Sequence, residues 1–176
     1  PRCPSLYSRL SDDDVMSMVM YLRSLPPIEN DPGESVYNIP LPPAYGPPVG
    51  SVAHPDEGVT VSYGEYLAGP VAHCIECHSP MGPKGPDWMN QLGAGGFEFH
   101  GPWGTSVSSN LTQHSEDGLT HWTDDELAQM ITTGIRPDGS PMMPPMGYGY
   151  YSRMTPDDLN AVILYLRQIP PMPDPS

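Results

Sequence analysis

The chain has 176 residues, of which 38% are hydrophobic, 25 are proline and 18 are glycine. This composition leaves little side-chain volume for a core, so we expect a buried cofactor to fill part of it. The formal net charge of −14 argues against a nucleic-acid partner, because phosphate binding depends on Lys and Arg. Such a charge instead suits docking to a basic patch on another protein.

The sequence contains no run of about 18 apolar residues, so no membrane-spanning segment is expected in this chain. No signal peptide is visible. Because the first residue is Pro1 and not Met, we expect a processed, trimmed or partial chain, with any anchor or signal lying ahead of it.

A repeat of 22 residues lies near the two ends of the chain. Residues 7–28 read YSRLSDDDVMSMVMYLRSLPPI and residues 151–172 read YSRMTPDDLNAVILYLRQIPPM, with ten identical positions at an offset of 144. Each copy predicts a helix with an N-cap, at Ser11 and at Thr155, an apolar stripe at helical spacing and a proline pair after it. The match extends into the flanking Tyr-Ser-Arg and Pro-Pro, which favours a duplication over two unrelated helices.

The segment 29–60 is rich in proline and has almost no periodic apolar pattern, so it is interpreted as an extended linker. After it, short helices are expected at 63–68, 123–133 and 155–168. The second of these has a capping box in Thr123 and Glu126. Residues 79–121 are rich in Gly and Ser, and we expect loops there.

The sequence Cys74-Ile75-Glu76-Cys77-His78 is the C-x-x-C-H signature of covalent haem attachment. Two intervening residues let one helical turn place both sulfurs along one edge of the porphyrin, where each forms a thioether with a vinyl group. His78 then directs its imidazole to the iron as the proximal ligand. We therefore expect haem c, with one covalent haem in these residues.

Two other uses of the cysteine pair are less favoured. A redox-active C-x-x-C pair is expected within a βαβ pattern, which the sequence lacks. A zinc site would need two more ligands at suitable spacing, and the remaining cysteine, Cys3, is far away in the chain.

The sixth iron ligand is expected from the proline-flanked segment 141–147, which contains Met142, Met143 and Met146. A thioether raises the reduction potential, and a rigid proline-rich backbone holds it with little reorganisation. The chemistry alone does not choose among the three, which are also able to serve as flexible core residues. A bis-histidine site is the alternative, with a ligand from the remaining histidines His54, His100, His114 and His121.

Further motifs occur in a fixed order along the region from Val61 to Pro171. They are GEYLA at 64–68, GGFEFHGPWG at 95–104, NLT at 110–112, GLTHWT at 118–123, GIRPDG at 134–139 and PPM at 144–146. Together with the attachment sequence and the last helix, they resemble the class I-like cytochrome c domains in cytochrome subunits of bacterial membrane-bound dehydrogenases and related respiratory complexes.

The resemblance implies an all-α fold, a small cytochrome c fold with about three to four helices around a covalent haem and long irregular loops. Its first and last helices are expected to cross, with Gly64 and Tyr66 near Tyr165 and Leu166.

The resemblance also implies the site residues. The family pattern of two prolines, a Met ligand, a proline and an aromatic residue selects Met146, although Gly147 replaces the third proline here. Trp103, Asn110 and Arg136 lie in motifs that line the haem in such domains.

Read with the resemblance, the repeat divides the chain into three parts. Residues 1–28 are expected to be the closing helix of a truncated or degenerate upstream cytochrome c-like domain, followed by the linker 29–60 and a cytochrome c domain at 61–176. The repeat position matching Met146 is Arg2, which does not ligate iron. We favour a multihaem protein of which this is the C-terminal part over the loss of the first domain. Cys3 then has no assigned role.

The expected function is extracytoplasmic electron transfer, in the periplasm and as part of a membrane-associated complex. The chain is thus expected to be a carrier and not an enzyme. Its partner would be a dehydrogenase, a quinol-oxidising complex, an oxidase or another cytochrome. The alternatives are part of a dihaem peroxidase-type enzyme, a haem-based gas or redox sensor in which Met146 dissociates, and a structural subunit whose linker wraps a neighbour.

Overall fold

The computed structural model describes residues 6–38, 49–83 and 85–175, which form two compact units. The large unit comprises Pro1–Arg9 and Pro55–Ser176, and the small unit comprises Leu10–His54. These boundaries differ from the predicted ones, and the assignment of residues 1–28 to an upstream domain stays a prediction. Arg2 and Cys3 lie outside the described residues.

The small unit contains helix α1 (Asp12–Ser24), which lies within the first copy of the repeat. The Oγ of Ser11 accepts the Asp14 N–H at 3.1 Å, which confirms the predicted N-cap. Three aspartates fill the first turn, where the helix dipole favours negative charge. None of the residues of α1 is buried.

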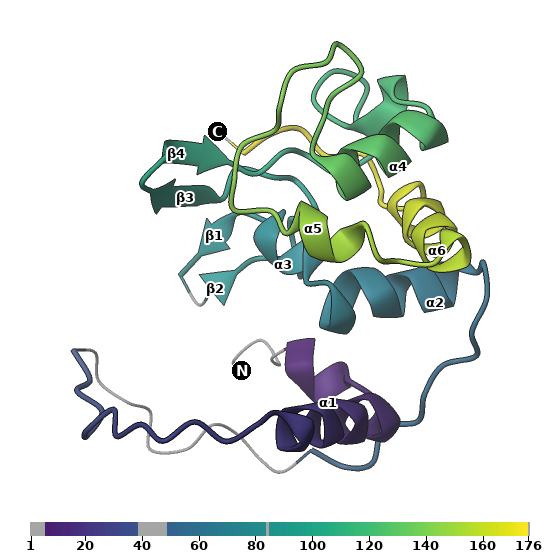
Figure 1. The fold of residues 1–176 in the computed structure, drawn as a ribbon. Coiled ribbons are helices and arrows are strands. Elements are labelled where there is room, and N and C mark those ends of the chain that lie inside the picture. The colour runs from purple at the N-terminus through teal and green to yellow at the C-terminus, as the bar shows by residue number, and fades with distance from the viewer. Residues whose placement is uncertain (1–5, 39–48, 84, 176) are drawn as a thin grey trace. The chain divides into compact units, whose positions relative to one another are not determined.

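Helices position the site of the large unit (Figure 1). They are η1 (Leu6–Arg9), α2 (Val61–Tyr66), η2 (Leu67–Val71), α3 (Cys74–Cys77), η3 (Leu119–His121), α4 (Asp124–Thr133), α5 (Tyr148–Tyr151) and α6 (Pro156–Leu166). The predicted helix 63–68 starts earlier and ends later, because Thr60 caps it and a π-helical turn carries it through Pro70 to Val71.

The other two predicted helices are confirmed with their caps. Helix α4 has the complete capping box of Thr123 and Glu126 and ends at Gly134, whose φ of 70° is the left-handed value typical of a helix C-terminus. The Oγ1 of Thr155 caps α6 by accepting the Asp158 N–H at 3.1 Å.

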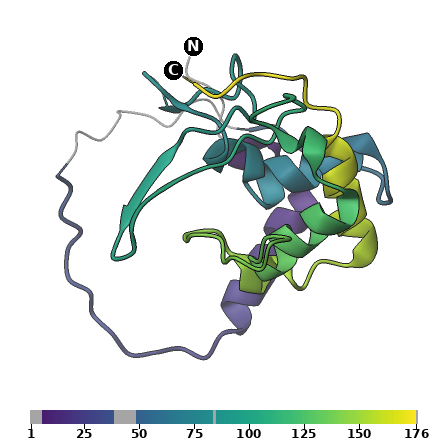
Figure 2. The same ribbon diagram turned by 90° about the horizontal axis from the view of Figure 1, so that it is seen from above.

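Two short antiparallel hairpins replace part of the loop region predicted at 79–121. Strand β1 (Met81–Gly82) pairs with β2 (Gly85–Pro86), and β3 (Glu98–Gly101) pairs with β4 (Gly104–Val107). Figure 2 shows the second hairpin extending away from the helices of its unit. Strands this short carry too little alternation for a pattern to reveal them.

The core of the large unit is the crossing of α2 and α6, which confirms the predicted contact of the first and last helices. A Cβ on Gly64 would lie 1.9 Å from the Ala161 carbonyl oxygen and 2.9 Å from Cβ of Tyr165, so only glycine lets these backbones approach. A helical domain is thus confirmed, with hairpins added. None of the helices in the described ranges has the length and apolar character needed to span a bilayer.

Candidate haem-binding site

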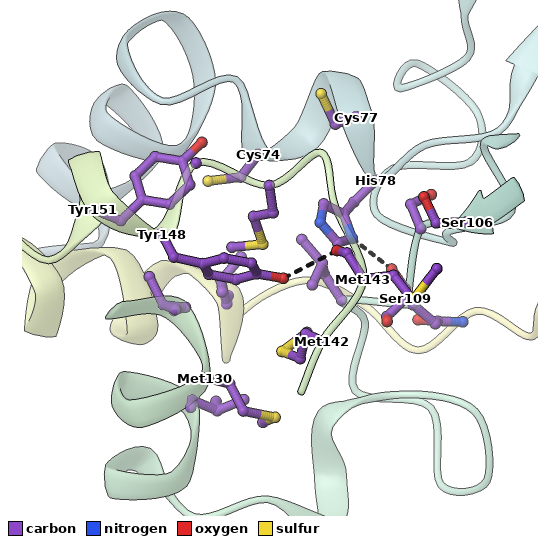
Figure 3. Close-up of a pocket in the computed structure, with 18 of the residues that line it drawn as sticks. Cys74, Cys77, His78, Ser106, Ser109, Met130, Met142, Met143, Tyr148 and Tyr151 are labelled. Carbon is purple, nitrogen blue, oxygen red and sulfur yellow. Dashed lines mark hydrogen bonds between the residues drawn. The ribbon is translucent and has the colours of Figure 1, made fainter. Parts of the chain in front are cut away.

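A cavity of about 560 Å³ in the large unit brings together most of the predicted site residues (Figure 3). Helices α4 and α6 supply apolar walls, including Leu127, Met130, Val162 and Leu166. All four of these side chains also belong to the core cluster. The site is therefore built into the hydrophobic core and offers apolar walls to a large planar group.

Helix α3 delivers both thiols to this cavity. His73, just before the helix, has a left-handed φ of 57°, which turns the chain from η2 into α3. Burial raises the pKa of the Cys74 thiol to about 12, and burial together with the nearby Glu76 raises the pKa of Cys77. These surroundings favour an uncharged sulfur, the state that a thioether provides.

The imidazole of His78 lies in the same cavity, and a main-chain oxygen fixes its orientation. Nδ1 of His78 lies 2.7 Å from the carbonyl oxygen of Ser109 and donates to it (Figure 3). The remaining nitrogen, Nε2, then carries the lone pair that a metal needs. Desolvation lowers the pKa of His78, while the bond to Ser109 raises it, and the net lowering favours the neutral ring.

The segment with Met142, Met143 and Met146 also lines the cavity. Three hydrogen bonds to its main chain hold it in place. The Met142 N–H donates to the Gly134 carbonyl at 2.8 Å, and the Tyr148 hydroxyl donates to the Met143 carbonyl at 3.3 Å. The third bond runs from the Ser106 hydroxyl to the Pro144 carbonyl. A thioether on this segment is therefore held by rigid main chain.

The three methionines differ in surroundings. Met142 packs against the core cluster, Met143 is exposed, and Met146 is half-buried at the cavity. Met142 thus has a packing role already, while Met146 has the access and the partial burial that suit a ligand.

Of the three predicted haem-lining residues, two line the cavity. Arg136 does so while its Nη1 donates to the Pro141 carbonyl at 2.8 Å, which ties it to the methionine segment. Asn110 also lines the cavity, but its amide is used by the chain itself: Nδ2 donates to the Met172 carbonyl and Oδ1 accepts the Thr112 N–H. Trp103 is partly exposed in the β3–β4 turn and is absent from the cavity lining found among the described residues.

The alternative histidines do not gather at the cavity. Among the residues that the structure describes, His100, His114 and His121 are absent from its lining, and His54 lies in the small unit. His73 lines the cavity next to Cys74, and its Nδ1 lies 2.6 Å from a carboxylate oxygen of Glu76.

Sequence reasoning missed two groups of site residues. Tyr148 and Tyr151 line the cavity, and the Tyr151 hydroxyl donates to the Ala72 carbonyl at 3.0 Å beside α3. The aromatic residue expected after the Pro-Pro-Met motif was a signal for Tyr148. The Ser109 carbonyl has no such signal, because a main-chain acceptor leaves no trace in residue type.

Comparison with known proteins gives a consistent result. The family model described as "Cytochrome c" matches residues 64–170. The cytochrome subunit of fructose dehydrogenase from Gluconobacter japonicus is 32% identical over 118 residues, which cover 66% of this chain and 23% of that protein.

Two further relatives extend this comparison. The cytochrome c subunit of a quinone-dependent alcohol dehydrogenase from Gluconacetobacter polyoxogenes is 33% identical over 121 residues, covering 68% of this chain and 24% of the relative. A "diheme cytochrome c-type" protein from Cereibacter sphaeroides is 24% identical over 178 positions, covering 93% of this chain and 56% of that protein. The chain thus spans about a quarter of the length of the dehydrogenase subunits.

The family match covers more than half of the chain and includes the cavity, both thiols, the imidazole and the methionine segment. The donor set fits a porphyrin bound through two sulfurs, with iron ligands available from imidazole and thioether. The chain therefore belongs to the cytochrome c family, which binds haem c covalently and transfers electrons through it.

Proposed function

We propose that this chain is the electron-transfer part of a dehydrogenase complex, with haem bonded to Cys74 and Cys77 and its iron held by His78 and Met146. The observation that carries the proposal is the cavity itself. It joins two thiols and an oriented imidazole from one short turn to a thioether segment that comes from about 70 residues further along the chain. Separate segments of the chain would thereby hold the iron through donors of different chemistry, an imidazole and a thioether.

Bound haem would supply one-electron chemistry, with its iron changing between the ferric and ferrous states. The residues of this chain lower the reorganisation that accompanies a change of oxidation state. The apolar walls exclude water, and the rigid methionine segment limits movement between the two states. With both His78 and Met146 bound to it, the iron would have no open position for peroxide or a gas, which favours a carrier over a peroxidase-type enzyme or a sensor. Arg136 is the proposed partner of a haem propionate, because it is the one Lys or Arg among the described residues that line the cavity.

The ligand assignment is tested by replacing each methionine of the segment with leucine. Met146→Leu should abolish the weak far-red band of the ferric protein that marks a Met–iron bond, and should lower the reduction potential. Met142→Leu and Met143→Leu are the matched controls and should keep the band. Loss of the band in either control, with Met146→Leu unchanged, would reassign the ligand.

Covalent attachment is tested by intact mass. The natural protein should carry one haem per attachment sequence under denaturing conditions, and the double variant Cys74→Ala with Cys77→Ala should lose the haem of this domain. A mass that shows no haem on this segment would remove the basis of the proposal.

The proposed electron donor is a dehydrogenase subunit outside the cytoplasm. Two of the relatives are named as cytochrome subunits of dehydrogenases, and covalent haem attachment of this kind is expected on the extracytoplasmic side of the membrane. The net charge of −14 favours a basic docking face on the partner. Electron transfer from a purified dehydrogenase should therefore slow as ionic strength rises, and fractionation should place the protein in the periplasm or with the membrane.

We further propose that residues 1–28 close an upstream cytochrome c-type domain of the same polypeptide. The repeat supports this, as does the order of a short helical turn, an N-cap and a helix in both copies, η1 with α1 and α5 with α6. The alignment with the diheme relative over 93% of the chain points the same way. The test is the haem count of the complete natural polypeptide: two or more haems support the proposal, and one haem contradicts it.

A further inference from the structure

The short helix η1 has an unusual pattern of burial for the start of a repeat copy. At an offset of 144 residues, Leu6 corresponds to Tyr150 and Tyr7 to Tyr151. Tyr150 is 80% exposed, but Leu6 is only 2% exposed and belongs to the core cluster of the large unit. The residue that faces outward in the second copy is therefore an anchor in the first.

The next residue shows the reverse change. Tyr151 is half-buried, lines the haem cavity and bonds to the Ala72 carbonyl, whereas Tyr7 is 65% exposed. The tyrosine that lines the haem cavity in the second copy is thus exposed to solvent in the first. This exchange is expected if η1 belongs to a second domain of the same fold and also contacts this one.

Other side chains of η1 contact residues of the large unit beside the cavity. The Tyr7 ring lies 4.6 Å from the His73 ring between centroids, and His73 lines the cavity next to Cys74. The Arg9 guanidinium lies 2.7 Å from a carboxylate oxygen of Glu65 on α2. An apolar anchor, an aromatic contact and an ion pair therefore join η1 to the elements that lead into the attachment turn.

We propose that η1 docks the upstream cytochrome c-type domain against the His73 side of this haem site, so that Tyr7 and His73 lie between the two haems. This inference rests on the proposed upstream domain. In that domain Tyr7 would take the haem-lining place that Tyr151 takes here, so two side chains in contact connect one haem pocket with the other. One electron passes along this route from reduced to oxidised iron, with no bond made or broken.

The experiment uses the complete natural polypeptide, with its haems counted by mass before any variant is made. Leu6→Asp places a charge at the buried anchor, and its matched control is Tyr150→Asp at the exposed repeat position. Pulsed EPR between the two ferric haems reports their separation. The equilibrium constant for docking should fall at least about tenfold in Leu6→Asp, because burying a leucine is worth more than the 1.4 kcal/mol of one decade. Tyr150→Asp should keep the native distance.

The route is tested separately from the docking. Tyr7→Leu keeps an apolar side chain and should leave the inter-haem distance and both reduction potentials unchanged, while electron transfer between the haems after flash reduction becomes slower. Tyr150→Leu, which removes an exposed tyrosine, should leave that rate unchanged. Equal rates in the Tyr7→Leu variant and the natural protein would overturn the route.

Circular dichroism and haem absorbance check that each variant is folded. If Leu6→Asp unfolds this domain, Arg9→Glu replaces it, and the exchange of charges in Arg9→Glu with Glu65→Arg should restore the native distance. An unchanged inter-haem distance in a folded Leu6→Asp or Arg9→Glu variant would overturn the docking. A single haem in the natural polypeptide would instead contradict the upstream domain itself, so the two failures are distinguishable.

Discussion

Helices α1 and α6 carry the two copies of one sequence pattern but have different surroundings. In α6 the apolar stripe is buried, with Leu166 only 3% exposed, whereas the corresponding Leu22 of α1 is 63% exposed. Both helices have the same N-cap hydrogen bond, at 3.1 Å in each. The sequence pattern thus specifies a helix with one apolar face. Whether that face is buried depends on a second element that packs against it, as α2 does for α6.

The largest expected difference between the two copies lies in the apolar stripe. Leu166→Ala should lower the free energy of unfolding by about 2–5 kcal/mol, because it leaves a cavity in the core between α2 and α6. Leu22→Ala should change it by less than about 0.5 kcal/mol in this chain, since the side chain is already in solvent. Denaturant unfolding followed by haem absorbance and by far-ultraviolet circular dichroism measures both.

The same pair of variants in the complete polypeptide sharpens this comparison. There Leu22→Ala should cost about as much as Leu166→Ala, because the proposed upstream domain would cover the stripe of α1. A cost close to zero in the complete polypeptide would mean that α1 remains uncovered, and the proposed domain would lose its support.

An intermediate difference is expected at the arginine that both copies share. The Arg167 guanidinium donates to the Leu119 carbonyl at 2.9 Å and binds Asp124 at 2.8 Å, which holds the segment between η3 and α4 against α6. Arg167→Gln should cost about 1.5–3 kcal/mol, the usual range for hydrogen bonds of a charged group. Arg23→Gln should cost less than about 0.5 kcal/mol, because Arg23 is exposed on α1.

Tryptophan fluorescence checks the local effect of the arginine, since Arg167 also donates to the Trp122 carbonyl. The emission should change in Arg167→Gln and stay the same in Arg23→Gln. Equal responses of the two variants would show that the bonds of Arg167 do not hold the segment between η3 and α4 against α6.

The smallest difference is expected at the caps, where the two copies should behave alike. Thr155→Ala and Ser11→Ala should each destabilise their own helix by about 0.5–2 kcal/mol, because each removes one acceptor for a helix N–H. Hydrogen exchange of the amides in the first turns of α6 and α1 resolves the two effects. A large effect in one helix and none in the other would show that the caps depend on tertiary packing.

The sequence predicted those features that depend on neighbouring residues. The caps at Ser11, Thr123 and Thr155 and the attachment turn are local patterns, and the structure has each of them where expected. The contact of Gly64 with α6 was predicted through the resemblance and is confirmed.

Other features depend on contacts between distant segments and were not predicted. The hairpin of β3 and β4, the carbonyl that orients His78 and the burial of Leu6 have no signature in residue type or spacing. Trp103 illustrates the opposite case: its motif suggested a haem contact, yet the turn in which it lies packs its ring on Gly101. Whether it contacts the haem stays a prediction.

The bond between His78 and Ser109 has a consequence for how such a protein can diverge. The acceptor is main chain, so no point replacement at position 109 removes it as long as the loop keeps its path. Substitution of the side chain at position 109 therefore leaves the electron-donating strength of the proposed proximal ligand unchanged. Changes in the reduction potential during evolution are then expected from the methionine segment and from solvent access to the cavity.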